Sequence, residues 1–249
     1  MTPLVADILA VQRLYRVAVV EGGATIWGRG STATGALAVL FGQIFGTATA
    51  DPLAYAGNAV TFTILDTGGA DLLDLGLDAR NQRIDLNPEG ISDVQGLTGN
   101  LIIARGTLIE NCIAGSGDDW VNGNRAGNGL WGGAGAERLA GGGGADIFVW
   151  QSVAQALADH IRDFTPGSDR FALSAIDLDD VTPGHQGFHV IDQAVFGQRV
   201  GKLRFAVDPA TGLTRIEGDG EGDVDGDGVA EVALYLTAVF ALLASDFLL

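Results

Sequence analysis

Residues 114–149 read AGSGDDWVN GNRAGNGLW GGAGAERLA GGGGADIFV, which are four copies of a nine-residue unit. The fourth position of each copy is small, the sixth bears a side-chain oxygen and the eighth is apolar. The sixth positions are Asp119, Asn128, Glu137 and Asp146, and the eighth positions are Val121, Leu130, Leu139 and Phe148. A period of nine residues indicates a repeat architecture in which every copy adds one turn and one short strand.

This repeat predicts a parallel β-roll that binds calcium in its turns. Glycine allows positive φ angles and close backbone approach, so the carbonyl groups of each turn converge near the sixth-position oxygen. The last three residues of each copy form a strand, and the eighth side chain points inward. Two copies complete one coil, which pairs Asp119 with Glu137 and Asn128 with Asp146. The other turn residues of these sites are Gly115, Gly117, Asn124, Gly132, Ala134, Gly141, Gly142 and Gly144.

Two of the sixth positions depart from Asp. Asn128 supplies a neutral oxygen, and Glu137 carries one more methylene group. Calcium coordination is flexible enough to accept both, with weaker binding. The alternative is a degenerate solenoid whose turns are held by hydrogen bonds alone.

The composition indicates a globular chain with a cationic partner. Its 31 acidic and 14 basic residues give a net charge of -17, which disfavours nucleic acid and anionic membrane surfaces. The most apolar stretch, residues 232–244, has 13 residues, whereas a membrane span needs about 20. The N-terminus does not resemble a secretory signal peptide. The single cysteine, Cys112, excludes an intrachain disulfide and fits a buried apolar position.

No catalytic motif is evident. Lys202 is followed by Leu203, so there is no phosphate-binding Gly-Lys-Ser/Thr loop. The only histidine pair at zincin spacing is His185 and His189, which has Gln186 in place of the catalytic Glu. The regular spacing of the carboxylates among glycines fits cation ligation better than glycoside hydrolysis.

Several motifs, in order, resemble a known family. They are TPLVADILAVQRLY (2–15), LDTGGADLLDL (65–75), NQRIDLN (81–87), ISDVQGLTGNLIIARGTLIEN (91–111), the four nonapeptides and HIRDFTPGSDRFALS (160–174). Together they resemble the C-terminal calcium-binding RTX domain of serralysin-type secreted metalloproteases. The resemblance is strongest over residues 63–174.

The resemblance implies an all-β fold, in which a parallel β-roll packs with a sandwich-like set of strands. Residues 1–17 resemble a short helix at the end of the family's catalytic domain. Residues 18–249 would then form the RTX domain, with C-terminal strands and a secretion signal in 175–249. The final ASDFLL (244–249) resembles the uncleaved signal that type I exporters read, which implies a secreted, extracellular protein.

The family's remaining calcium sites map onto three further parts of the chain. A first cluster would join an N-terminal loop to the DTGGAD loop, and a second would be completed near residue 110. Asp159 is a candidate last ligand, and Asp163 fits a turn cap better. The residues implied for the two clusters are Glu21, Gly23, Thr25, Asp66, Gly68, Gly69, Asp71, Leu108 and Glu110, with Glu21 and Leu108 contributing backbone oxygens.

The family's zinc-binding catalytic domain has no counterpart here, so we expect a non-catalytic domain that binds several calcium ions and no zinc. Two alternatives remain. The chain could be the C-terminal portion of an active zinc protease, or a structural or adhesive module in which residues 37–45 or the C-terminal strand meet a partner. No feature names a protein partner. Asp223, Asp225 and Asp227 resemble the start of an EF-hand loop, but Leu234 replaces its closing Glu, which favours a hairpin turn.

Overall fold

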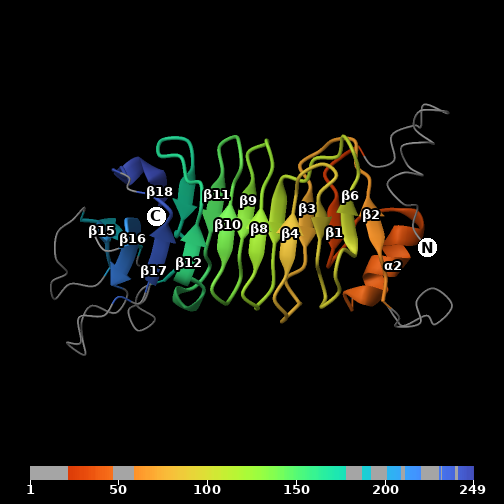
Figure 1. Cartoon of the computed structure of the whole chain (residues 1–249), viewed down its shortest axis with the longest axis horizontal. Helices are drawn as coiled ribbons and strands as arrows, with labels where there is room; N and C mark the ends of the chain where they lie inside the picture. The colour runs from red at the N-terminus through yellow and green to blue at the C-terminus, as the bar shows by residue number, and fades with distance from the viewer. Residues whose placement is uncertain are drawn as a thin grey trace.

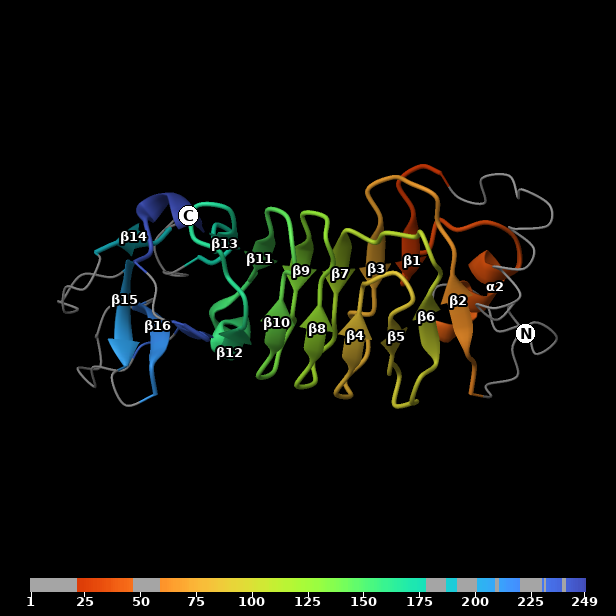
Figure 2. The ribbon, with the colours of Figure 1, turned by 45° about the horizontal axis from the view of Figure 1, so that its top comes forward.

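The computed structural model describes residues 22–46, 59–177, 187–191, 201–208, 211–219, 230, 232–238 and 241–249. Almost all elements are short strands, stacked along one axis in two facing layers (Figures 1 and 2). This confirms the predicted all-β fold built on a parallel β-roll. The predicted helix over 1–17, Glu21, His185 and the EF-hand-like Asp223, Asp225 and Asp227 lie outside the described residues.

The first layer is a seven-stranded sheet in which all neighbours are parallel. Its strands, in spatial order, are β1 (Ile26–Gly28), β3 (Leu72–Asp74), β7 (Asn111–Ile113), β9 (Gly129–Trp131), β11 (Ile147–Val149), β13 (Arg170–Ala172) and β18 (Phe247–Leu248).

The second layer is an eight-stranded sheet. In spatial order its strands are β4 (Arg83–Asp85), β8 (Trp120–Asn122), β10 (Arg138–Ala140), β12 (Leu157–Ile161), β17 (Val232–Leu236), β16 (Leu213–Asp219), β15 (Lys202–Asp208) and β14 (His189–Val190). Pairing is parallel from β4 to β17 and antiparallel through β17, β16 and β15. The C-terminal strands therefore extend the same sheet as the repeats.

A small third sheet continues the second layer beyond β4 (Figure 2). It contains β2 (Phe62–Ile64), β6 (Leu101–Ile103) and β5 (Ile91–Ser92), and a single bridge between Arg83 and Asp93 joins it to β4. Two 3-10 turns, η1 (Val153–Gln155) and η2 (Ala244–Asp246), precede β12 and β18.

The strand register shows how the nonapeptides are wound. Trp120 of β8 lies opposite Arg138 of β10, and Gly129 of β9 lies opposite Ile147 of β11. Both offsets are 18 residues, so two copies make one coil, as the sequence predicts. The four eighth-position side chains are at most 1% exposed and face the interior between the layers.

The core is built from register rows of these inward side chains. In the first layer one row runs through Trp27, Leu73, Cys112, Leu130, Phe148, Phe171 and Phe247. Aromatic rings close the C-terminal end of this row, where Phe164 stacks on Phe171 with ring centroids 4.3 Å apart. Because successive coils superimpose, each apolar side chain packs on the equivalent side chain of its neighbours.

The described helix, α2 (Gly35–Ile44), covers the N-terminal end of the roll (Figure 1). Phe41 is fully buried and packs edge-on against Trp27 and Phe62, with ring centroids 6.0 and 5.1 Å away. Phe45, which follows the helix, is 4% exposed. The expectation that residues 37–45 present an apolar surface to a partner is therefore wrong for these two phenylalanines, because they seal the end of the core.

Candidate metal sites in the stacked turns

An oxygen-bearing side chain directly precedes each central strand and links its turn to the previous coil. The backbone N–H of Asp119 donates to Oε2 of Glu137 at 2.8 Å, and the N–H of Asn128 donates to Oδ1 of Asp146 at 2.7 Å. Both predicted pairs are thus brought together. The N–H of Glu137 donates in turn to Asp159 at 2.9 Å, so the ladder continues along the second layer.

Burial disfavours the ionised form of these carboxyl groups and raises their pKa values. Burial, followed by the charges of Asp159 and Asp119, raises the pKa of Glu137 to about 8, against a lowering hydrogen bond from Asp119. Burial is also the largest cause that raises the pKa of Asp119 and Asp146 to about 6. Carboxyl groups that are buried close to other carboxyl groups favour either a proton or a cation beside them.

The backbone in the turns leaves room for oxygen ligands and for little else. A Cβ atom at Gly133, where φ is +102°, would overlap the carbonyl oxygen of Gly115. A Cβ atom at Gly135 would lie 2.5 Å from the carbonyl oxygen of Gly117 and 2.6 Å from Oε1 of Glu137. Oε1 itself is buried and has no hydrogen-bond partner. Carbonyl oxygens beside an unpartnered carboxylate oxygen are the donor set that calcium prefers, so these residues fit the ion.

The turns on the other side of the roll repeat this arrangement. A Cβ atom at Gly142 would overlap the carbonyl oxygen of Asn124. A Cβ atom at Gly144 would lie 2.6 Å from the carbonyl oxygen of Ala126. A Cβ atom at Gly141 would overlap Oδ2 of Asp146. Likewise, a Cβ atom at Gly132 would lie 2.6 Å from Cγ of Glu137. Gly132 and Gly141 therefore make room for the sixth-position side chains.

The loop cluster near the N-terminal end also assembles. Asp71 accepts a 2.7 Å hydrogen bond from the N–H of Thr25 and its own N–H donates to Glu110 at 2.8 Å. Burial, with Asp66 and Glu110 nearby, raises the pKa of Asp71 to about 6. Oδ2 of Asp71 and Oδ2 of Asp66 are buried without a partner, so two carboxylates offer oxygens at this point.

Two glycines shape this cluster, and their role as calcium ligands stays a prediction. The N–H of Gly68 donates to Oδ1 of Asp66 at 3.0 Å. A Cβ atom at Gly69 would lie 2.5 Å from the carbonyl oxygen of Gly23, which brings the two loops into contact. For Leu108 the ligand role stays a prediction, and it is the neighbouring Thr107 whose hydroxyl donates to the carbonyl oxygen of Asp66 at 2.9 Å.

Asn128 uses its amide as a cross-link. Its Nδ2 donates to the carbonyl oxygen of Glu110 at 2.9 Å, and its Oδ1 accepts from the N–H of Asn124 at 2.8 Å. Asp could not make the first of these bonds, because an ionised carboxylate only accepts. Hydrogen bonds therefore link the turns at 110 and 128, where the repeat pattern predicts a bound cation.

Asp159 is likewise satisfied by the protein. Its Oδ1 accepts from Glu137, and its Oδ2 accepts a 2.7 Å hydrogen bond from Nε1 of Trp150. Burial raises the pKa of Asp159 to about 7. Asp163 accepts from the N–H groups of both Gly141 and Gly142 at 2.9 Å, which agrees with its expected role as a turn cap.

The sequence analysis missed four residues that extend the stack. Asp169 accepts from the N–H of Asp146, and Asp246 accepts from the N–H of Gly167, at 3.0 and 2.9 Å. Gln82 and Asp78 extend it toward the N-terminal end. Asp169, Asp246 and Gln82 each stand directly before a strand, a signal that could have found them outside the nine-residue period.

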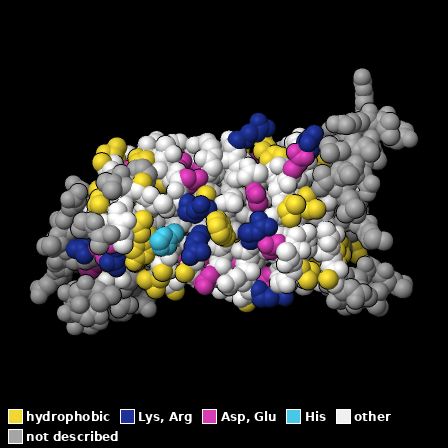
Figure 3. Space-filling model, in the orientation of Figure 1, with side chains coloured by type: hydrophobic (Ala, Val, Ile, Leu, Met, Phe, Trp, Pro, Cys, Tyr) yellow, Lys and Arg dark blue, Asp and Glu magenta, His cyan; other side chains and the backbone are white. Residues whose placement is uncertain are grey.

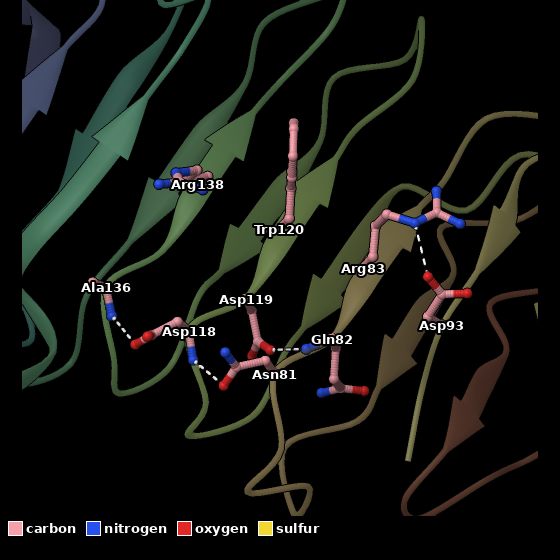
Figure 4. A pocket seen from close by; sticks show the side chains of 9 residues that line it. All are labelled: Asn81, Gln82, Arg83, Asp93, Asp118, Asp119, Trp120, Ala136 and Arg138. Atoms are coloured by element: carbon pink, nitrogen blue, oxygen red, sulfur yellow. Dashed lines mark hydrogen bonds and ion pairs between the residues drawn. The ribbon is translucent and has the colours of Figure 1, made fainter. Parts of the chain in front are cut away.

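Positive charge collects on the outer face of the second layer, away from the buried carboxylates. Arg83, Trp120, Arg138 and His160 form one register row across β4, β8, β10 and β12, and arginine side chains gather there in Figure 3. The guanidinium of Arg162 lies 5.0 Å from the Trp120 ring. Beside this row, a cavity of about 430 Å³ opens toward the turns (Figure 4).

No three His, Cys, Asp or Glu side chains within the described ranges form a metal-binding group. The sites described above draw on backbone carbonyls as well as carboxylates. None of the helices in the described part of the chain is long and apolar enough to cross a membrane.

The fold and the stacked acidic turns define a repeat protein of the parallel β-roll class. The family model for the peptidase M10 serralysin C terminal matches residues 46–234, and the chain belongs to this family. It is 37% identical over 220 residues to the metallopeptidase AprA of Pseudomonas marginalis, covering 81% of this chain and 43% of that protein. It is 37% identical over 195 residues to the serralysin of Photorhabdus luminescens, covering 73% and 37%.

The chain thus spans less than half the length of these relatives. Among solved structures, the AlgE6R2 subunit of the Azotobacter vinelandii mannuronan C5-epimerase aligns with a TM-score of 0.39 and 22% identity, over 80% of this chain and 96% of that one. That likeness is too slight to add to the family assignment.

Proposed function

We propose that this chain is a non-catalytic calcium-binding domain of a secreted protein, and that calcium drives its folding. The observation that carries the proposal is the position of Glu137. One of its oxygens ties two coils together while the other is buried without a partner among backbone carbonyls. An ionised carboxylate in that place is unfavourable unless a cation neutralises it.

Raised pKa values occur along the whole stack, and Asp71 shares with Glu137 a buried carboxylate oxygen that has no partner. Asp71, Asp119, Glu137, Asp146 and Asp159 all have raised pKa values because the fold buries them. When bound, calcium supplies the positive charge that lets these carboxylates stay ionised inside the fold. The turns hold the carboxylates and carbonyls in register, so binding free energy becomes folding free energy.

This coupling links folding to secretion. Extracellular calcium modules bind at about 10⁻⁴ to 10⁻³ M, so low intracellular calcium leaves the turns unstable. Asp246 is fully buried and Phe247 pairs within the roll, so these two residues of the segment 244–249 are accessible only before the chain folds. We infer that type I export reads this segment in the unfolded chain, and that the domain folds outside the cell.

Far-UV circular dichroism tests the proposal. The spectrum in EGTA at pH 8 should lack the strand signal that appears in millimolar calcium. A fully folded spectrum in EGTA, unchanged by calcium, would refute calcium-driven folding.

A second candidate is that the chain forms the C-terminal portion of an active zinc protease. It is favoured by one observation, which is that the Pseudomonas marginalis relative is named as a metallopeptidase and that both relatives extend well beyond the matched region. The upstream reading frame decides between the two. A His-Glu-x-x-His motif there would make this domain part of a protease, and its absence would favour the first candidate.

A further inference from the structure

We propose that residues 78–82 form an additional calcium-binding turn, in which Asp78, Gln82 and Asp119 supply the side-chain ligands. This segment, Asp-Ala-Arg-Asn-Gln, lies outside the nonapeptides and has no Gly-rich signature. The inference rests on the proposed calcium-binding function only for the identity of the ion.

The backbone of 78–82 stacks on the turn 115–119 in the same way as that turn stacks on 133–137. The N–H of Ser116 donates to the carbonyl oxygen of Asp78 at 2.9 Å, and the N–H of Ala134 donates to that of Gly115 at 3.3 Å. A Cβ atom at Gly115 would overlap the Asp78 carbonyl oxygen, as one at Gly133 would overlap that of Gly115.

The equivalence continues through the rest of the turn. A Cβ atom at Gly117 would lie 2.7 Å from the carbonyl oxygen of Arg80, just as a Cβ atom at Gly135 would lie close to the carbonyl oxygen of Gly117. Arg80 and Gly117 thus occupy equivalent positions in successive turns. The N–H of Gln82 donates to Oδ1 of Asp119 at 2.7 Å, as the N–H of Asp119 donates to Glu137. Gln82 therefore stands at the sixth position of a turn one coil earlier.

Both oxygens of Asp119 accept backbone N–H bonds, Oδ1 from Gln82 and Oδ2 from Gly115, whereas polar atoms of Gln82 and Asp78 lack partners. Gln82 is 3% exposed, and neither its Oε1 nor its Nε2 has a hydrogen-bond partner within the protein. Nε2 of its amide lies 3.2 Å from the place of a Cβ atom at Gly115, next to the Asp78 carbonyl, so an ion bound there requires the amide to turn by half a rotation and present Oε1 instead. Oδ2 of Asp78 is buried and also without a partner. A buried amide with both groups unpaired is costly. An ion between the two turns would satisfy its Oε1 but not the donor Nε2.

Arg80 does not remove the need for a cation. Its Nε donates to Oδ1 of Asp78 at 2.9 Å, which leaves Oδ2 untouched. The Arg80 side chain is 62% exposed, whereas the Asp78 side chain is 1% exposed. The exposed arginine thus pairs with one oxygen of this carboxylate, while the other oxygen is buried without a partner. Two carboxylates, an amide oxygen and turn carbonyls form an all-oxygen donor set suited to calcium.

Counting bound calcium tests the inference. Asp78→Ala and Gln82→Leu should each bind one calcium ion fewer per chain than the wild type, measured by equilibrium dialysis and elemental analysis in millimolar calcium. The control is Asp118→Asn, because Asp118 is exposed in the same turn and its Oδ1 only caps Ala136. Its count should equal that of the wild type.

Stability without calcium gives a second readout. In EGTA at pH 5, Gln82→Leu should be at least as stable as the wild type, because the change removes an unsatisfied buried amide, whereas in calcium it should be less stable. If Asp78→Ala fails to fold, the number of bound calcium ions is compared between Asp78→Asn, Gln82→Leu and the wild type. An unchanged calcium count in these variants overturns the inference. A wild type that binds no calcium refutes the proposed function instead.

Discussion

The N–H of Asp119 donates a 2.8 Å hydrogen bond to Oε2 of Glu137, and Oε1 of the same carboxylate is buried with no partner. The extra methylene of Glu137 is accommodated beside Gly132, where a Cβ atom would lie 2.6 Å from Cγ. Glutamate therefore fills the sixth position without breaking the link between coils, and it keeps one oxygen for a ligand. The predictions below depend on such pairings.

Asp71→Ala should lose more calcium-dependent stability than Glu137→Ala. Asp71 faces Asp66 and Glu110 and joins three loops, whereas Glu137 serves one stack of turns. The measurement is the difference between the melting temperatures in calcium and in EGTA for each variant. A larger loss in Glu137→Ala would show that the strongest site lies in the repeats.

The calcium-free protein should become less stable as pH rises. A carboxyl group whose pKa is higher in the folded state keeps its full contribution below the unfolded pKa, near 4.5 for Glu137, and loses it as pH rises through about 8. Asp159, with a pKa of about 7, acts in the same direction. Far-UV circular dichroism in EGTA, followed from pH 5 to pH 8, measures the effect as a loss of the strand signal.

Glu137→Gln is the matched variant for this pH dependence. It keeps a hydrogen-bond acceptor for Asp119 but removes the charge, so the loss of stability between pH 5 and pH 8 should become smaller. Calcium should stabilise this variant less than the wild type. An unaltered pH dependence would mean that Glu137 does not titrate as its burial implies.

Gly133→Ala should destabilise the protein by about 2 kcal/mol or more, because the methyl group meets the Gly115 carbonyl and the residue has a φ of +102°. Gly143→Ala is the control in the next copy, since a Cβ atom there would have Cα of Arg125 as its nearest neighbour, 3.7 Å away. It should change stability by no more than about 0.5 kcal/mol. Denaturation in calcium measures both, and equal effects would contradict the stacking of the turns.

Trp150→Phe should cost about 1 to 3 kcal/mol, because it leaves Oδ2 of the buried Asp159 without its indole donor. Trp131→Phe serves as the control, since Trp131 is only partly buried on β9. Urea denaturation in calcium compares them. If the two variants lose the same stability, the Trp150–Asp159 hydrogen bond contributes nothing beyond packing.

Much of the roll could be predicted from the nine-residue period. The strands at 120, 129, 138 and 147, the inward Val121 and Phe148, and the pairing of Asp119 with Glu137 all follow from it. Each depends on local turn chemistry that repeats exactly along the chain. The partners of Asn128 and Asp159 did not follow, because the Glu110 carbonyl and the Trp150 indole come from outside the repeat phase.

The sequence by itself determined the coil, because glycines and inward apolar residues at fixed spacing leave the backbone one way to wind. Only the tertiary structure decided what stacks on the ends of the repeats. Thr25 meets Asp71 across 46 residues, Gln82 meets Asp119 across 37, and Gly167 meets Asp246 across 79. The physical reason is that the N–H and C=O groups at a sheet edge can form hydrogen bonds with any backbone strand. Which strand pairs there is therefore determined by how its side chains pack in the core.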